Sequence, residues 1–273
     1  MTASPLRRAY ADTVLGQLHY AEMGSGDPLI LLHQTPRSHE EFYELQPLLA
    51  QRRRVIAMDM YGFGLSAKPP SPQCIEDYAR GVLALADALE LTSYAVLGHH
   101  TGMFVASEVA ASDPGRVSAV VLSSGKFVDA EFRATTQPPG PDDVDVAPIR
   151  DDGGHLQTLW DKRRQLYPAG RPELLDAFVR DALAPGVDPA EGHRAVKRYR
   201  MENRVGLVTA PVLVIGATDD PVAYPHTDRV VQAYRNAARV ERHDVLGGGI
   251  PLMEERPGEV ADVVGAFLDR LGH

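Results

Sequence analysis

A single cysteine, Cys74, occurs among the 273 residues of the sequence. One thiol excludes an intramolecular disulfide framework and a zinc site built from cysteines. No stretch is long and apolar enough to span a bilayer, and residues 1–8 lack the apolar core of a signal peptide. We therefore expect a cytoplasmic protein that does not bind membranes.

Basic residues are in the minority, because 28 lysines and arginines stand against 37 acidic residues and give a formal net charge of −9. An acidic chain without a basic run is a poor partner for nucleic acid. The ten histidines show neither H-x-x-x-H nor H-E-x-x-H spacing. We therefore expect no nucleic-acid partner, no metal site and no cofactor.

Short apolar runs alternate with amphipathic segments along the first 122 residues. We predict strands at residues 7–13, 17–22, 29–32, 54–58, 94–97 and 116–122, and helices at residues 40–50, 75–90 and 101–112. This alternation is typical of an α/β protein with a mostly parallel, twisted sheet and helices on both faces.

The alternation stops near residue 127. A proline-rich loop at 138–141 is followed by helices predicted at 156–167, 172–183 and 189–205. Strands at 212–215 and 239–245, and helices at 226–237 and 257–271, then resume the first pattern. We predict an α/β core formed by residues 1–126 and 207–273, with a helical cap of residues 127–206 inserted after the sixth strand.

The segment Gly98-His99-His100-Thr101-Gly102 joins a predicted strand to a predicted helix. Glycines two positions on either side of a central residue mark the nucleophile elbow, G-x-S-x-G, a strained turn that holds the central side chain in a pocket. Here the central residue is His100, not serine, cysteine or aspartate.

With this elbow, the chain resembles the α/β-hydrolase-fold superfamily, in the branch that contains epoxide hydrolases, haloalkane dehalogenases and esterases. Three further segments carry the resemblance: the oxyanion-loop sequence His33-Gln34-Thr35-Pro36, the segment from Asp59 to Ser66, and the acid-bearing loop Gly216-Ala217-Thr218-Asp219. The resemblance implies an α/β-hydrolase fold over nearly the whole chain.

The chain departs from the family at two catalytic positions. His100 stands at the position of the nucleophile, and Ile250 stands where the family's last glycine-rich loop presents a histidine. Gln34 replaces a glycine of the oxyanion loop, either to bind substrate or to fill space. The acid is retained, and the resemblance favours Asp219, three positions after the glycine of its loop, over the neighbouring Asp220.

These residues predict a rearranged catalytic site. A neutral imidazole at a helix start can act as a base or as a nucleophile, and we predict one of these roles for His100. We expect Asp219 to orient His100, and the backbone amides of Thr35 and Thr101 to form an oxyanion hole.

A helical cap over this site implies a pocket for a small-molecule substrate. The partner that we expect is a mostly apolar carbonyl or ester-type compound. The residues predicted to bind it are Gln34, His39, Trp160, Tyr167 and Ile250.

Without a serine–histidine pair, we favour non-hydrolytic proton transfer over simple ester hydrolysis, as a lyase, isomerase, cyclase or decarboxylase would perform it. One alternative is an inactive small-molecule-binding protein, because gibberellin receptors resemble hydrolases and also have an aliphatic residue in place of the catalytic histidine. The other alternative is an ordinary hydrolase whose base lies elsewhere, for example at His226.

Overall fold

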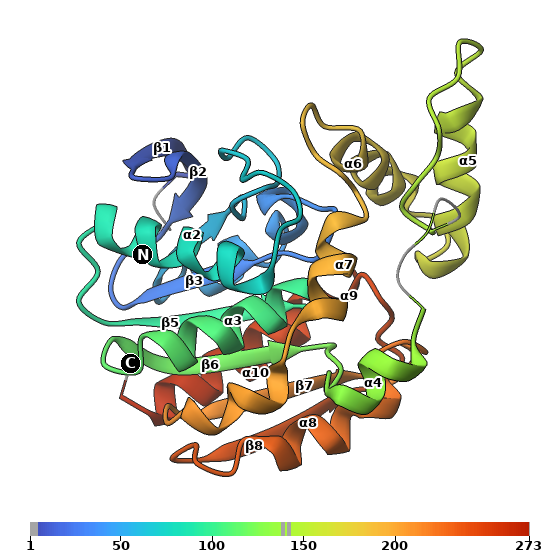
Figure 1. Ribbon diagram of the computed structural model, residues 1–273. Coiled ribbons are helices and arrows are strands. Elements are labelled where there is room, and N and C mark those ends of the chain that lie inside the picture. Colours follow the sequence, from blue (N-terminus) through green and yellow to red (C-terminus); the bar gives the residue numbers. More distant parts are fainter. Residues whose placement is uncertain (1–4, 138–139, 141–142, 273) are drawn as a thin grey trace.

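The computed structural model describes residues 5–137, 140 and 143–272 and contains an eight-stranded sheet (Figure 1). The strands follow the order β1-β2-β4-β3-β5-β6-β7-β8. Their bounds are β1 Arg7–Thr13, β2 Gly16–Met23, β3 Pro28–Leu32, β4 Arg54–Met58, β5 Tyr94–His99, β6 Val117–Ser123, β7 Val212–Ala217 and β8 Val240–Val245. The first two pairings, β1 with β2 and β2 with β4, are antiparallel, and the others are parallel.

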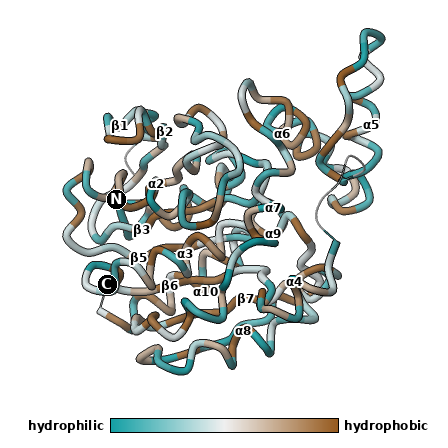
Figure 2. Tube along the Cα trace, viewed as in Figure 1, coloured by the Kyte–Doolittle hydropathy of each residue, from teal (hydrophilic) through white to brown (hydrophobic). Residues whose placement is uncertain are grey.

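Helices cover both faces of this sheet, which confirms the predicted α/β architecture. The helices α2 (Ile75–Ala88), α3 (Thr101–Ser112) and α8 (Thr227–Ala233) pack into one apolar core. The helices α1 (Gln46–Leu49), α9 (Leu252–Glu255) and α10 (Pro257–Arg270) pack into a second core on the opposite face. Figure 2 shows hydrophobic residues gathered along the central strands and on α3, which is consistent with strands buried on both faces.

A helical block lies between β6 and β7, as the sequence predicts. Its helices are α4 (Ala130–Thr135), α5 (Gly154–Arg163), α6 (Pro172–Ala182) and α7 (Glu191–Arg198), with the short 3-10 turn η2 (Arg164–Leu166) after α5. In Figure 1, α5 and α6 stand away from the sheet, and a small apolar cluster of their own holds them together. The helix α4 was not predicted, and most of the predicted loop at 138–141 lies outside the described residues.

Three predicted helices are broken into shorter pieces. Predicted helix 40–50 is a 3-10 turn, η1 (His39–Phe42), followed by α1, because Pro47 lacks the N–H that a continuous helix would use. Predicted helix 189–205 ends with α7 and continues as η3 (Met201–Asn203) and η4 (Val205–Leu207). Predicted helix 226–237 consists of η5 (Tyr224–His226) and α8.

Loops that follow several parallel strands meet at one edge of the sheet. The elbow follows β5, and the loops after β3, β6 and β7 lie at the same carboxyl edge. This edge is where ligands bind in open α/β sheets, so the fold places the predicted site residues near one another. Within the part of the chain that is described, no helix has the length and apolar character needed to cross a membrane.

Candidate active site

The turn between β5 and α3 has the geometry of a nucleophile elbow. His100 lies at φ +47° and ψ −112°, and its N–H donates to the carbonyl of Ser123 at 3.0 Å. A Cβ on Gly98 would lie 2.0 Å from the carbonyl oxygen of Gly102, and a Cβ on Gly102 would lie 2.0 Å from that of Leu32. Only glycine therefore fits at both positions, and the two glycines hold His100 in a strained conformation.

His100 faces a buried carboxylate. The Nε2 atom of His100 lies 3.0 Å from Oδ2 of Asp220, although the contact is not aligned as a linear hydrogen bond. The other oxygen of Asp220 accepts the backbone N–H groups of Val222 at 2.9 Å and Ala223 at 3.0 Å. Catalytic hydrogen bonds are often poorly aligned before substrate binds. The distance of 3.0 Å, rather than the angle, is therefore the evidence that His100 and Asp220 interact.

The carboxylate beside His100 is therefore that of Asp220, and not that of Asp219, which the sequence analysis favoured. Asp219 is exposed, and its carboxylate accepts from the hydroxyl of Thr218 at 3.2 Å. The N–H of Asp220 donates to the carbonyl of Ala217 at 3.1 Å and closes a turn that directs the Asp220 side chain inward. Sequence spacing could not separate two adjacent aspartates, whereas this turn does.

The environment of Asp220 keeps its carboxylate ionised. Burial opposes the charged form, but the imidazole of His100 and the two backbone N–H groups outweigh burial and lower the pKa of Asp220. An ionised carboxylate only accepts hydrogen bonds, so it favours the tautomer of His100 that carries its proton on Nε2. The lone pair is then on Nδ1, which has no hydrogen-bond partner among the described residues.

His99 supports the turn from below and does not face the cavity. Its ring lies between the hydroxyl of Ser123 at 3.1 Å and the carbonyl of Ile250 at 2.9 Å. Burial, followed by the neighbouring His100, lowers the pKa of His99 to about 3. A neutral His99 thus ties the elbow to the loop that holds Ile250.

Thr35 and Thr101 line the cavity together with His100. Thr101 is the first residue of α3, where the N–H has no intrahelical acceptor, and Thr35 follows Gln34 in the loop after β3. Within the described part of the chain neither amide has an acceptor, and the Thr35–Pro36 bond is cis. The role of these two N–H groups as an oxyanion hole stays a prediction.

The loop that carries Thr35 is anchored by buried charges. The carboxylate of Glu41 accepts the N–H of Gln34 at 2.7 Å, and burial raises the pKa of Glu41 to about 8 against the opposing charge of Arg37. The guanidinium of Arg37 donates to Glu254 at 2.8 and 2.9 Å and to Asp181 at 3.0 Å. Arg37 thereby joins the loop to α9 and to cap helix α6.

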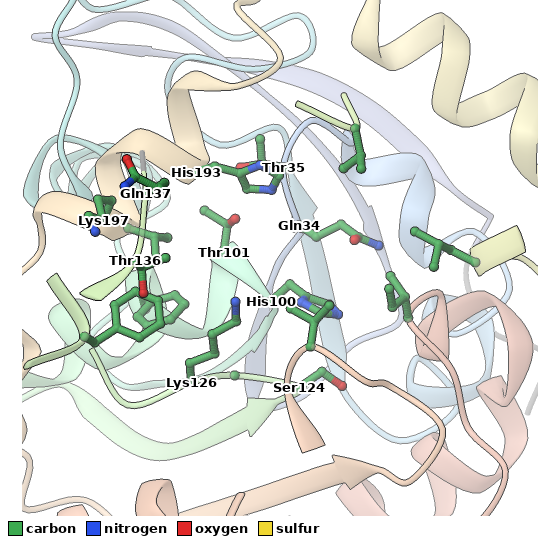
Figure 3. Close-up of a pocket in the computed structure, with 18 of the residues that line it drawn as sticks. Gln34, Thr35, His100, Thr101, Ser124, Lys126, Thr136, Gln137, His193 and Lys197 are labelled. Atoms are coloured by element: carbon green, nitrogen blue, oxygen red, sulfur yellow. The ribbon is translucent and has the colours of Figure 1, made fainter. Parts of the chain in front are cut away.

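A cavity of about 450 Å³ opens above His100 and Thr101 (Figure 3). Its walls are mostly apolar, and two of the predicted substrate-binding residues, Gln34 and Ile250, line it. The other lining residues are Thr35, Phe104, Ser124, Gly125, Lys126, Phe132, Thr136, Gln137, Val144, Arg163, Leu166, His193, Val196, Lys197 and Val222. A mostly apolar cavity with a few polar groups is suited to a small organic molecule.

Three predicted substrate-binding residues lie elsewhere. The Nδ1 atom of His39 lies 2.8 Å from Asp59, which keeps the ring buried beneath the loops. Tyr167 is buried in the core of the cap, where its ring centroid lies 6.2 Å from that of Phe178, and Trp160 packs at the edge of the same cluster. A small cap needs its aromatic residues for its own core. The sequence prediction assigned them to the substrate because it did not allow for this need.

Sequence reasoning also missed polar residues of the cavity. Among them are Ser124, Lys126, Arg163 and Lys197. Ser124 and Lys126 directly follow β6, so their place at the carboxyl end of a parallel strand was a usable signal. Arg163 and Lys197 lie on cap helices, and no spacing rule connects them to the core.

Among the described residues, two groups of side chains have the composition of metal sites. In the group of His19, His39 and Asp59, the ring nitrogens lie 3.0 and 2.8 Å from the carboxylate, which are hydrogen-bond distances. In the group of Asp143, Asp145 and His193, the guanidinium of Arg163 already pairs with Asp145. Hydrogen bonds and an ion pair therefore account for both groups.

Comparisons with known proteins identify the family to which this fold belongs. The family profile described as "alpha/beta hydrolase fold" matches residues 27–254. A haloalkane dehalogenase of Agrobacterium fabrum is 27% identical over 288 residues, which cover 97% of this chain and 92% of that protein. Haloalkane dehalogenase 2 of Mycobacterium tuberculosis is 31% identical over 131 residues, and the match spans 48% of this chain and about half, 46%, of that relative.

Solved structures share the fold at lower identity. An epoxide hydrolase from an endophytic Streptomyces has a TM-score of 0.77 and 23% identity, with 97% of this chain and 96% of that chain covered. The profile match extends over most of the sequence, and the cap lies within it. The chain therefore belongs to the α/β-hydrolase fold family.

Proposed function

We propose that the protein is an enzyme that moves a proton on a small, mostly apolar carbonyl compound, with His100 as the general base. The observation that carries this proposal is the position of His100, at the elbow and 3.0 Å from buried Asp220. An ionisable side chain in a strained turn, oriented by a carboxylate, has the attributes of a catalytic group.

The proposed step uses groups that lie around one cavity. The lone pair on Nδ1 of His100 removes a proton from the carbon next to the substrate carbonyl, and the ring becomes an imidazolium that Asp220 stabilises. The electron pair of the broken C–H bond moves toward the carbonyl oxygen. The N–H groups of Thr35 and Thr101 are suited to hold the resulting enolate oxygen until the proton returns to the same or another atom.

Simple ester hydrolysis through a side-chain alcohol is less well supported. His100 replaces the hydroxyl-bearing residue of the G-x-S-x-G pattern, and Ile250 contributes only an aliphatic side chain from the last loop. The curated relatives are named haloalkane dehalogenases and a bifunctional epoxide hydrolase, so attack on such substrates belongs in the same screen.

The two alternatives make different use of the histidines. A base at His226 is disfavoured because His226 is not among the described residues that line the cavity. A protein that only binds a ligand needs the cavity but has no need for a strained histidine paired with Asp220. The pair therefore favours catalysis over binding alone.

A substrate screen tests the proposal. The purified protein is assayed against esters, lactones, epoxides, haloalkanes and β-keto acids, beside the variants His100→Ala and His226→Ala. We expect turnover of a carbonyl compound that His100→Ala abolishes and His226→Ala retains. Full activity of His100→Ala would contradict the proposal, and ligand-induced thermal stabilisation without turnover would favour the binding protein.

A further inference from the structure

The lining of the cavity carries positive charge without matching negative charge. Lys126, Arg163 and Lys197 contribute cationic side chains, and no aspartate or glutamate is found among the described residues that line the cavity. Lys126 follows β6, whereas Arg163 and Lys197 lie on cap helices α5 and α7. The cations thus come from both the core and the cap.

Only one of these three cations has a carboxylate partner. Arg163 pairs with Asp145, a fully buried residue beneath the cavity wall. The amines of Lys126 and Lys197 instead lie 5.6 and 5.9 Å from the ring centroid of Phe132. Across the described residues, neither amine has an ion-pair partner, and Nζ of Lys197 is buried without a hydrogen bond.

A buried ammonium without a counter-ion is unfavourable in an apolar environment. Burial lowers the pKa of Lys126, while the charge of Asp220 acts in the opposite direction. The aromatic face of Phe132 stabilises a cation less than an ion-pair partner within the cavity would. An anion bound in the cavity close to these amines would supply the missing partner.

We propose that the substrate carries a carboxylate, and that Lys126 and Lys197 bind it beside the ring of Phe132. This inference rests on the proposed function in one respect only, namely that the carbonyl group of the substrate lies beside His100. In Figure 3, Lys126 extends from the end of β6 toward His100 and Thr101, while Lys197 lies with Thr136 and Gln137. A carboxylate bound there lies in the same cavity as the base and the two backbone amides.

The remainder of the cavity limits the substrate class. Phe104, Leu166, Val196 and Val222 present aliphatic or aromatic surface. A substrate that matches both the cationic and the apolar part of the cavity is an oxo acid, or a lactone acid, with an apolar or aromatic body. The volume of about 450 Å³ is sufficient for a molecule of this kind.

Calorimetric titration with matched acids and amides tests the charge requirement. The probes are 3-phenylpropanoate, 4-phenylbutanoate and benzoylacetate, each beside its neutral amide. We expect each acid to bind at least about 10-fold more tightly than its amide, a difference of about 1.4 kcal/mol. The double variant Lys126→Met, Lys197→Met should lose this preference, because methionine keeps the length of the side chain but not its charge.

Two controls separate the anion site from overall charge and from folding. The exposed pair Arg164→Met, Arg235→Met removes the same charge outside the cavity and should keep the preference for acids. The double variant Lys126→Arg, Lys197→Arg keeps the charge within the cavity, so it should also keep the preference for acids. Circular dichroism and thermal melting establish that each variant is folded.

The outcomes distinguish this inference from the proposed function. Equal binding of acids and amides, failure of all three acids to bind, or an acid preference that survives the double methionine variant would each overturn the carboxylate site. His100→Ala should still prefer acids, since binding does not require the base. A protein that prefers acids but shows no His100-dependent turnover retains the anion site and loses the proposed catalysis.

Discussion

Replacing Asp220 with asparagine should change the protonated nitrogen of His100 while leaving the fold in place. In the wild type the N–H groups of Val222 and Ala223 lie 2.9 and 3.0 Å from Oδ1 of Asp220. The carbonyl oxygen of the new amide can still accept both. The second carboxylate oxygen, Oδ2, which lies 3.0 Å from Nε2 of His100, is replaced by an NH₂ group that donates hydrogen bonds. Because a donor requires an acceptor, the proton of His100 should move from Nε2 to Nδ1.

The magnitude follows from the contacts that are lost and kept. Two backbone hydrogen bonds persist and one charged contact is lost, so we expect the free energy of unfolding to fall by about 2 kcal/mol. Asp220→Ala removes all three contacts and should cost about 4 kcal/mol. With its lone pair moved away from the substrate, His100 should lose about 10²–10⁴-fold in turnover, as the corresponding substitution does in serine-protease triads.

The assay is long-range ¹H–¹⁵N correlation NMR of histidine-labelled protein, which distinguishes the two tautomers without a substrate. Wild-type protein should show His100 protonated on Nε2, and Asp220→Asn should show it protonated on Nδ1. Asp219→Asn is the matched control, because Asp219 is exposed, and it should resemble the wild type. A tautomer that changes in Asp219→Asn, or in neither variant, would refute the assignment of Asp220.

Three further predictions concern the elbow, the anchored loop and the last loop. Gly98→Ala should destabilise the protein by more than about 3 kcal/mol in urea denaturation, because its Cβ would lie 2.0 Å from a carbonyl oxygen, whereas Gly115→Ala, with no atom near its Cβ, should be tolerated. The pKa of Glu41 is raised from 4.5 to about 8 in the folded state, so the folded protein holds the proton more tightly and loses stability as the pH rises through this window. The free energy of unfolding, measured by urea denaturation, should therefore be lower at pH 9 than at pH 5 in the wild type. The decrease should be smaller in Glu41→Gln, and an equal decrease in both proteins would contradict the role of Glu41. Ile250→His should not produce a robust esterase, since no hydroxyl or thiol stands at the elbow; rapid acyl-ester turnover would contradict this reading.

Local sequence rules predicted the features that the backbone requires. The glycines at positions 98 and 102 are dictated by close backbone contacts, so their spacing identified both the turn and its central residue, His100. The alternation of apolar runs likewise predicted the parallel sheet and the helical block between β6 and β7. Gln34 and Ile250 line the cavity because they occupy loops whose place in the fold is fixed.

Features that depend on tertiary contacts could not be predicted in the same way. The choice between Asp219 and Asp220 depends on a turn in the loop, and an error of one residue exchanges a buried side chain for an exposed one. Tyr167 was assigned to substrate because its packing against the cap core is not visible in the sequence. Lys197 was missed because only the folded cap brings α7 over the site.

Hydrogen–deuterium exchange at the carbon next to a carbonyl tests the central role of His100 most directly. Oxo acids and their neutral analogues are incubated in D₂O with wild-type protein or His100→Ala, and loss of the α-proton signal is followed by ¹H NMR. The account predicts exchange that the wild type accelerates and that falls by at least about 10²-fold in folded His100→Ala. Exchange at the wild-type rate in the variant would contradict His100 as the base.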